Sequence, residues 1–184
     1  MLMQSFSETH PSNIFTYCPK CGSKSFSFNG IKVLKCAVCG LNYYINAAPA
    51  VAVVLEYPDG KIVLTRRKHE PKQGMFDLPG GFVEINESIK EAVVREIAEE
   101  LNVNVTRMNY LGSFPNEYVY KGVSYFTCDM AFVCRVPEGT RLTPSDDVSE
   151  ALMIKPNDID YQQISFPSII NILRLYISRL NDLV

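Results

Sequence analysis

Three glutamates lie close together near the end of the segment "VVREIAEELNV", residues 93–103. The spacing of its apolar residues predicts an amphipathic helix, with Glu96, Glu99 and Glu100 in the last turns. Carboxylates are disfavoured there, because the C-terminal end of a helix already carries partial negative charge. Like charges three or four residues apart also repel, at a cost of roughly a few tenths of a kcal/mol per pair. A bound divalent cation would remove both penalties.

A helical wheel places these carboxylates on one side of the helix. At about 100° per residue, Glu100 lies at about +40° and Glu99 at about −60° from Glu96, within roughly a quarter-turn. The cluster borders an apolar arc that is predicted to pack against a sheet. This arc contains Val93, Ile97 and Leu101.

Ligands that are all oxygen favour Mg²⁺ or Mn²⁺ over Zn²⁺. The alternative interpretation is a solvated acidic face whose charges pair with lysine or arginine. It fits less well, because Lys90 is the only lysine on this helix, although Arg95 is near. The sequence therefore predicts a divalent cation site.

Four of the six cysteines form a second candidate site. Two Cys-x-x-Cys pairs, each followed by glycine, are separated by 14 residues, and the intervening segment reads as a hairpin. Four thiolates suit tetrahedral Zn²⁺, whereas unrelated pairs or a redox pair are the less favoured alternatives. We expect this zinc ribbon to be structural, with the metal replacing a core that the segment is too short to build. The predicted ligands are Cys18, Cys21, Cys36 and Cys39.

The remaining elements indicate a mixed α/β chain with a small cysteine-rich module. An Asp59-Gly60 turn joins two β-rich runs, and a Gly/Pro-rich loop leads into the carboxylate helix. We expect a flexible lead-in over residues 1–13, the zinc ribbon over 14–46 and the main domain over 47–184. Further strands are predicted at 48–57, 62–68, 108–114, 124–136 and 151–156, and a final helix at 167–182.

The bulk composition is that of an ordinary globular protein. The chain of 184 residues is 47% hydrophobic and 21% charged, and its formal net charge is −2. No global positive field marks it as a binder of nucleic acid or of anionic membranes. It also lacks an apolar run of signal-peptide or membrane-spanning length. We expect a cytoplasmic protein with no membrane partner.

The loop and helix around the carboxylates resemble the Nudix box. In "GGFVEINESIKEAVVREIAEELNV", Gly81 is followed after five residues by Glu87, and after seven more by Arg95 and Glu96. One position departs from the pattern, since the family has a glycine where this chain has Asn102. Asparagine tolerates the left-handed conformation, so we expect the end of the helix to keep its geometry.

This resemblance implies a Nudix mixed-sheet α/β/α sandwich that hydrolyses a nucleoside diphosphate linked to another moiety. By similarity, Mg²⁺ or Mn²⁺ would be bound by the three helix carboxylates, by the main-chain carbonyl of Gly80 and by Glu150, which matches a later acidic ligand. Glu96 and Glu150 are the candidates for the base that deprotonates water. Gly81, Glu87 and Arg95 would hold the loop and orient the carboxylates.

A zinc ribbon directly before a Nudix domain resembles the NADH pyrophosphatase branch and some ADP-ribose or FAD pyrophosphatases. The junction "NYYINAAPAVAVV" matches that branch, whereas "GSFPNEYVYKGVSYF" replaces its Ser-Gln-Pro-Trp-Pro-Phe-Pro run. The aromatic residues could stack on a base or simply pack, and the arginine could reach phosphates or face solvent. The candidate substrate-binding residues are Tyr44, Arg66, Phe114 and Tyr118.

We therefore predict a Mg²⁺-dependent pyrophosphohydrolase acting on a dinucleotide or ADP-ribose type of substrate, such as NADH, ADP-ribose or FAD. One alternative is a nucleoside triphosphate or RNA-cap pyrophosphohydrolase. Another is a non-catalytic module that senses nucleotides or binds nucleic acid. The expected partner is a small nucleotide; a nucleic acid is disfavoured. A homodimer is suggested by analogy with this branch.

Overall fold

The computed structural model describes residues 7–30 and 32–182 of the chain, which forms two compact units. The first unit comprises the chain up to Ala47 together with Glu117–Phe126. The second comprises Ala48–Asn116 and Thr127–Val184. The sequence places a boundary close to Ala47, but it gives no sign that a segment seventy residues later joins the first unit.

A small antiparallel sheet forms the centre of the first unit. Its strands are β1 (Phe26–Phe28), β2 (Val33–Cys36) and β3 (Asn42–Tyr44), in that order. The expected hairpin between the cysteine pairs is confirmed as β1 and β2. One face carries the core of the unit, in which Cys18, Phe26, Leu34 and Cys36 are buried.

Part of the expected lead-in has a defined structure, and residues 1–6 of it lie outside the described residues. His10 caps the short helix α1 (Pro11–Ile14) and is 5% exposed. Its ring lies 5.2 Å from that of Phe28 and 5.5 Å from that of Phe126. The backbone N–H of Ser124 also donates to the Thr9 carbonyl at 2.7 Å. These contacts tie Glu117–Phe126 to the N-terminal segment.

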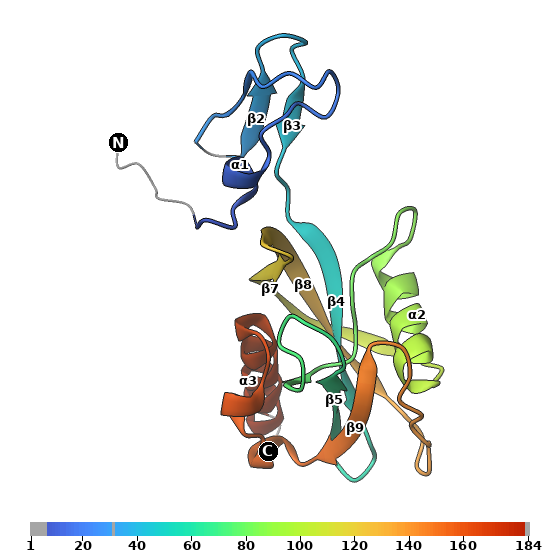
Figure 1. Ribbon diagram of the computed structural model, residues 1–184. Helices are drawn as coiled ribbons and strands as arrows, with labels where there is room; N and C mark the ends of the chain where they lie inside the picture. Colours follow the sequence, from blue (N-terminus) through green and yellow to red (C-terminus); the bar gives the residue numbers. More distant parts are fainter. Residues whose placement is uncertain (1–6, 31, 183–184) are drawn as a thin grey trace. The chain divides into compact units, whose positions relative to one another are not determined.

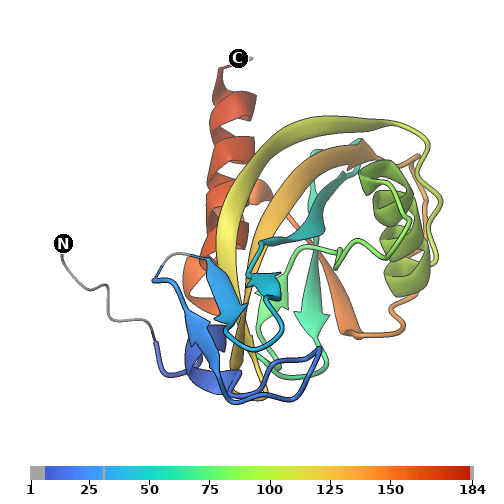
Figure 2. The same cartoon turned by 90° about the horizontal axis from the view of Figure 1, so that it is seen from above.

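The second unit contains a mixed sheet with one α-helix on each side, visible in Figures 1 and 2. This confirms the predicted α/β/α sandwich. The elements are β4 (Ala48–Glu56), β5 (Ile62–Arg67), β6 (Phe76–Asp77), α2 (Ile89–Leu101), β7 (Met108–Tyr120), β8 (Val123–Arg135), β9 (Val148–Ile154), the 3₁₀ helices η1 (Pro156–Asp158) and η2 (Tyr161–Gln163), and α3 (Pro167–Asn181).

The strand order is β6-β5-β4-β8-β7, and β9 pairs with β5. Strands β4 and β8 run parallel over nine residue pairs, whereas β5 is antiparallel to β4, β6 and β9. Because side chains alternate along a strand, the long central strand β4 presents a different set of residues to each helix layer.

The core beside α2 is built from one face of β4. Val51, Val53 and Leu55 cluster with the apolar stripe of α2, and every member of this stripe is fully buried. The stripe consists of Val93, Ile97 and Leu101, as the helical wheel predicts. Burial of such side chains stabilises the fold by about 1.5–3 kcal/mol each.

Helix α3 packs on the opposite side of the sheet. Its inward residues are buried, and the Arg179 guanidinium donates to the Leu111 carbonyl of β7 at 2.7 Å. A Cβ added at Gly112 would lie 2.9 Å from Cδ2 of Leu175, so the absence of a side chain at Gly112 leaves room for this leucine of α3. The buried residues of this helix include Ile169, Ile172, Leu173 and Tyr176.

Strand β7 is longer than the sequence predicts, because it continues through Pro115 to Tyr120. Proline removes a backbone donor, which usually ends a strand in the middle of a sheet, but β7 lies at the sheet edge, where proline is tolerated. Lys121 and Gly122 then turn the chain, both with positive φ (47° and 79°), as a two-residue hairpin turn requires. Strand β9 likewise starts at Val148 rather than at residue 151.

Within the part of the chain that the structure describes, every helix is too short or too polar to cross a membrane.

Asn102 ends α2 in the left-handed conformation (φ 56°, ψ 41°), and its N–H donates to the Ala98 carbonyl. This confirms the expected geometry. We expect Asn102→Ala to lower the free energy of unfolding by about 1 kcal/mol, because alanine lacks the short polar side chain that lets asparagine adopt the left-handed conformation, whereas Asn102→Gly should change it little. Urea denaturation of the three proteins measures the difference. Equal destabilisation by both substitutions would contradict this account.

Candidate functional site

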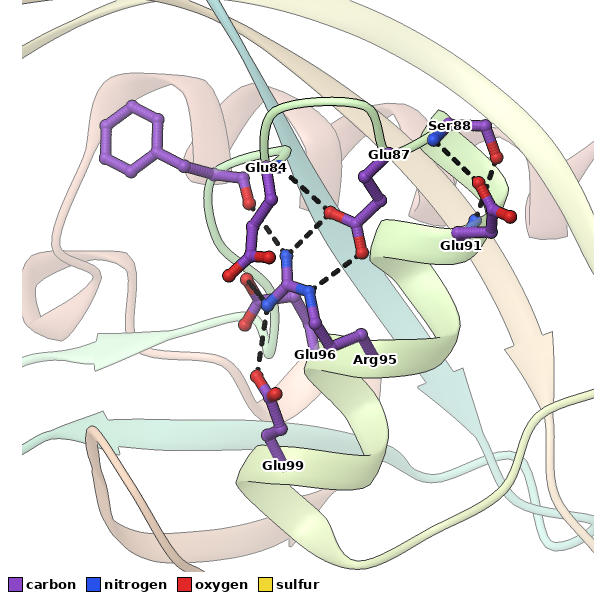
Figure 3. Close-up of polar contacts among 8 residues, drawn as sticks. Glu84, Glu87, Ser88, Glu91, Arg95, Glu96 and Glu99 are labelled. Atoms are coloured by element: carbon purple, nitrogen blue, oxygen red, sulfur yellow. Dashed lines mark hydrogen bonds and ion pairs between the residues drawn. The ribbon is translucent and has the colours of Figure 1, made fainter.

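Helix α2 is fixed at its N-terminus by a capping box. The Ser88 hydroxyl accepts a hydrogen bond from the Glu91 backbone N–H at 3.3 Å, and the Glu91 carboxylate accepts one from the Ser88 N–H at 2.8 Å. Figure 3 shows this pair at the start of the helix, beside Glu87. The cap satisfies two backbone donors that would otherwise lack partners and so sets where the helix begins.

Glu100 is a buried carboxylate with one hydrogen-bond donor. It is 7% exposed and accepts a hydrogen bond from the Gly80 backbone N–H at 3.1 Å. Burial, together with the charges of Glu96, Asp77 and Asp147, raises the pKa of Glu100 to about 9, although the bond from Gly80 opposes this shift. The ionised form therefore requires a cation that the described side chains do not supply.

Glu96 lies against the loop before the helix. It is 9% exposed, and its carboxylate occupies the space that a side chain at position 81 would need, since a Cβ there would lie 2.5 Å from Glu96 Oε1. Gly81 is therefore required for the close approach of loop and helix. Burial raises the pKa of Glu96, although Arg95 partly opposes this shift.

Arg95 joins the helix to the loop. Its guanidinium donates twice to the Glu87 carboxylate, at 2.8 and 2.9 Å, and once to the Phe82 carbonyl at 2.9 Å. It also donates to Glu96 at 2.8 Å and to Glu99 at 3.0 Å, so it lies at the centre of the carboxylates in Figure 3. Through these contacts Glu87 and Arg95 would orient the carboxylates, and that role remains a prediction.

The loop itself is attached to β4 like an additional strand. The Val51 N–H donates to the Gly81 carbonyl at 2.8 Å, and the Val53 N–H donates to the Pro79 carbonyl at 2.9 Å. Gly80 has φ +143°, and a Cβ there would lie 2.1 Å from the Val51 carbonyl oxygen. Only glycine fits at this position, so the loop can follow β4 closely enough for its N–H to reach Glu100.

Two aspartates from distant parts of the chain also lie in this region. Asp77, at the base of the loop, is buried and pairs with Arg67 at 3.0 Å. Burial raises the pKa of Asp77, with Arg67 opposing the shift. The charge of Asp147 raises the pKa of Glu100. Asp147 follows a turn in which the Ser145 N–H donates to the Glu100 carbonyl at 2.9 Å. Such long-range contacts leave no mark in the local spacing of residues.

Glu150 and Arg66 pair with each other rather than with α2. The Arg66 Nε lies 2.7 Å from Glu150 Oε2, and its guanidinium lies 4.1 Å from the centre of the Phe76 ring. The two residues are directly opposed in the β5–β9 register, one step from the Thr65–Ala151 pair. Since Ala151 packs in the α2 core, Arg66 and Glu150 leave the sheet on its other face.

The candidate aromatic residues fall in both units. Tyr44, on β3, is 52% exposed and belongs to the first unit. Tyr118 also belongs to the first unit, is half-buried, and its ring lies 6.5 Å from that of Tyr120. Phe114 lies on the β7 part of the second unit and is half-buried. Their contact with substrate remains a prediction.

The donor set on α2 fits a hard divalent cation. Two buried carboxylates, Glu96 and Glu100, have few donors of their own, and Glu99 is half exposed on the same side of the helix. Oxygen-only donors at the edge of a core are the ligands that Mg²⁺ and Mn²⁺ accept. The Gly80 N–H donates a hydrogen bond to Glu100. Binding of the metal by the Gly80 carbonyl remains a prediction.

The cysteines of the first unit converge as the spacing predicts. All four sulfur atoms lie within 4.8 Å of one another, with Cys18 and Cys39 3.6 Å apart and Cys21 and Cys36 3.7 Å apart. A tetrahedron with Zn–S bonds of about 2.3 Å has sulfurs about 3.8 Å apart, so this cluster fits Zn²⁺. The backbone N–H groups of Cys39 and Val38 lower the pKa of Cys36, whereas the neighbouring thiols raise the pKa of Cys21 against the N–H of Ser23. One thiolate therefore forms readily, and a bound metal would favour ionisation of the others.

Comparison with known proteins agrees with this geometry. The NUDIX domain model matches residues 46–171. The NAD-capped RNA hydrolase NudC of Vibrio atlanticus (strain LGP32) is 27% identical over 134 residues, covering 73% of this chain and 49% of that protein. The protein of that name from Pseudomonas aeruginosa (strain LESB58) is 32% identical over 97 residues, covering 53% of this chain and 34% of the relative.

Solved structures share the fold. A NUDIX hydrolase from Nitrosomonas europaea superposes with a TM-score of 0.64 at 21% identity, covering 89% of this chain and 91% of that one. The NUDIX domain of Shewanella oneidensis NrtR, complexed with ADP ribose, gives 0.61 at 20% identity, covering 73% and 89%. The chain spans between a third and a half of the length of the curated relatives it matches. With the family model covering most of the chain and the capped, arginine-bound carboxylate helix in place, the chain belongs to the Nudix family.

Proposed function

We propose that this protein is a Mg²⁺- or Mn²⁺-dependent pyrophosphohydrolase that cleaves the diphosphate of a dinucleotide or ADP-ribose type of substrate. The observation that carries the proposal is the burial of Glu96 and Glu100 against the Gly80–Gly81 loop. Carboxylates are costly to bury without a cation, and a fold that keeps two of them there gains stability when a cation binds.

The site residues would have separate roles in metal binding, positioning and proton transfer. Glu96, Glu99 and Glu100 would hold the cation, and Arg95 keeps the first two facing the loop. When bound, divalent cations neutralise the diphosphate and lower the pKa of a bound water. We favour Glu96 over Glu150 as the base that takes the proton of the attacking water, because Glu150 is tied to Arg66 on the other face of the sheet.

A capped RNA end is the second candidate substrate. Relatives carry the name NAD-capped RNA hydrolase, and the first unit is basic, with five lysines against two glutamates. On its outer sheet face the register aligns Ser27, Lys35 and Asn42 in one row beside exposed Tyr44. Base stacking on an exposed aromatic next to a lysine suits single-stranded nucleic acid.

Glu100→Gln is expected to lower kcat at least about 100-fold, since even residues that only orient metal ligands contribute 10–100-fold. The measurement is a panel of NADH, NAD⁺, ADP-ribose, FAD, deoxynucleoside triphosphates and NAD-capped RNA with Mg²⁺, with products separated by chromatography. Glu138→Gln, an exposed acid in the same unit, is the control. If Glu100→Gln hydrolysed the substrates at the wild-type rate, Glu100 would not belong to the site. If the wild-type protein hydrolysed none of them, the proposed activity would be wrong.

The pKa of Glu100 also predicts how stability depends on pH without a divalent cation. A carboxyl group whose pKa rises from 4.5 to about 9 on folding stabilises the protein fully below about pH 4.5, and this contribution is lost as the pH rises toward 9. Metal-free Glu100→Gln should therefore exceed wild type in unfolding free energy by about 1–3 kcal/mol at pH 8.5, and less at pH 6. Thermal unfolding with EDTA and with Mg²⁺ tests this. Parallel pH profiles for the two proteins would refute the assignment.

We further propose that the four cysteines bind one structural Zn²⁺. Removal of the metal with a chelator should unfold the first unit, because its few buried apolar residues cannot replace the site. Elemental analysis should give one zinc per chain for wild type and less for Cys36→Ser, with Cys128→Ser, outside the cluster, as the matched control. A metal-free protein with an unchanged fluorescence spectrum of its tyrosines would argue against a structural role.

A further inference from the structure

Another buried carboxylate lies on the opposite face of the sheet from α2. Asp129, on β8, is 7% exposed. Among the described residues, its carboxylate accepts one hydrogen bond, from the hydroxyl of Thr127 at 2.6 Å. Thr127 is itself 4% exposed. A carboxylate can accept about four hydrogen bonds, so most of this capacity is left for other donors.

The register of the parallel strands defines where this carboxylate lies. Asp129 pairs with Ala50 of β4, and Thr127 pairs with Ala48. The next residues, Val51 and Met130, pack in the core beside α2. Because side chains alternate, Asp129 and the alanines leave the sheet on the face away from α2.

This part of the sheet face is only partly covered. Ala48 and Ala50 are half-buried although β4 is a central strand, whereas Ala52 and Ala131, further along the same face, are 3% and 0% exposed. The small side chains of Ala48 and Ala50 form a low strip, which we call the floor, and the buried side chains of Thr127 and Asp129 lie beside it on β8. A flat group of a ligand could lie on this floor with its edge against the carboxylate.

The floor also adjoins the loop that holds the carboxylates of α2. Ala50 forms a bridge with Phe82, next to the Gly81 that Glu96 contacts. Asp129, Ala50 and Phe82 lie on neighbouring backbones, so two strand spacings, about 10 Å, separate Asp129 from this loop. A nucleoside attached to a diphosphate at the loop would extend over this distance.

We propose that Asp129, positioned by Thr127, accepts hydrogen bonds from the nucleoside part of the substrate and sets substrate preference. The proposal deepens the pyrophosphohydrolase function and rests on it. An ionised carboxylate accepts hydrogen bonds and repels phosphate, so it selects the neutral, donor-bearing end of the molecule over the diphosphate. The donors available on a nucleoside are the ribose hydroxyls and an exocyclic base amine.

The test compares kcat and KM of the full-length protein on ADP-ribose and on its hypoxanthine analogue, which lacks the base amine. Asp129→Asn should raise KM for ADP-ribose about tenfold to hundredfold, with kcat within about twofold, because a hydrogen bond to a charged group is lost. Thr127→Val, which keeps the carboxylate but frees it to rotate, should raise KM less. Asp158→Asn, an exposed acid of the same unit, is the matched control and should change neither constant.

The two substrates distinguish the donors. If the amine is recognised, wild type disfavours the hypoxanthine analogue and Asp129→Asn loses this preference. If the ribose hydroxyls are recognised, Asp129→Asn raises KM for both substrates by the same factor. An unchanged KM for both substrates, or an equal loss of kcat with KM unchanged, would overturn the proposal.

Failure of the underlying activity is separable from failure of this subsite. If wild type hydrolyses neither substrate, the proposed function fails, and calorimetric titration with ADP-ribose still compares binding by wild type and Asp129→Asn. Equal affinities would then refute the role of Asp129. Thermal unfolding of each variant shows whether a loss of binding is caused by loss of the fold. Thr127→Val, which leaves Asp129 in place, is the second variant whose affinity is compared with that of wild type.

Discussion

The close approach of helix α2 to the Gly80–Gly81 loop is the constraint on which the rest of the second unit depends. It desolvates Glu96 and Glu100, and no described cationic side chain compensates both. The loop can come this near only because two consecutive residues lack a Cβ, one against Val51 of β4 and the other against Glu96. The cost of burying charge is thereby concentrated where a metal ion would remove it.

Arg95 keeps this arrangement from relaxing. A guanidinium that donates to Glu87, Glu96, Glu99 and the Phe82 carbonyl fixes loop and helix in one geometry, and its own half-buried position limits competition from water. Lysine could not make these planar, paired contacts. The loop is also hydrogen bonded to β4, so the central strand carries the helix core on one face and the Ala50–Asp129 floor on the other.

The first unit is held together by different forces. Its sheet is too small to bury a large core, and two of the four clustered cysteines, Cys18 and Cys36, are part of that core. The β7–β8 tip adds His10 and Phe126 contacts and a backbone bond between Thr9 and Ser124. The β7–β8 hairpin starts and ends in the second unit, whereas its tip, Glu117–Phe126, belongs to the first. The chain therefore passes between the two units twice within this hairpin, in addition to the linker at Ala47.

The sequence by itself determined the parts of this protein that depend on local spacing. The thiolate cluster, the amphipathic face of α2, its left-handed end at Asn102 and the resemblance of residues 81–103 to the Nudix box could all be predicted, because each is a pattern within a few turns or strands. Only the tertiary structure decided which distant residues meet. It tied Glu150 to Arg66 across two strands and brought Asp77 and Asp147 toward Glu100. It also placed Asp129 beside Ala50 and joined residues 117–126 to the first unit. These contacts follow from strand order and register, which a linear pattern of side chains does not specify.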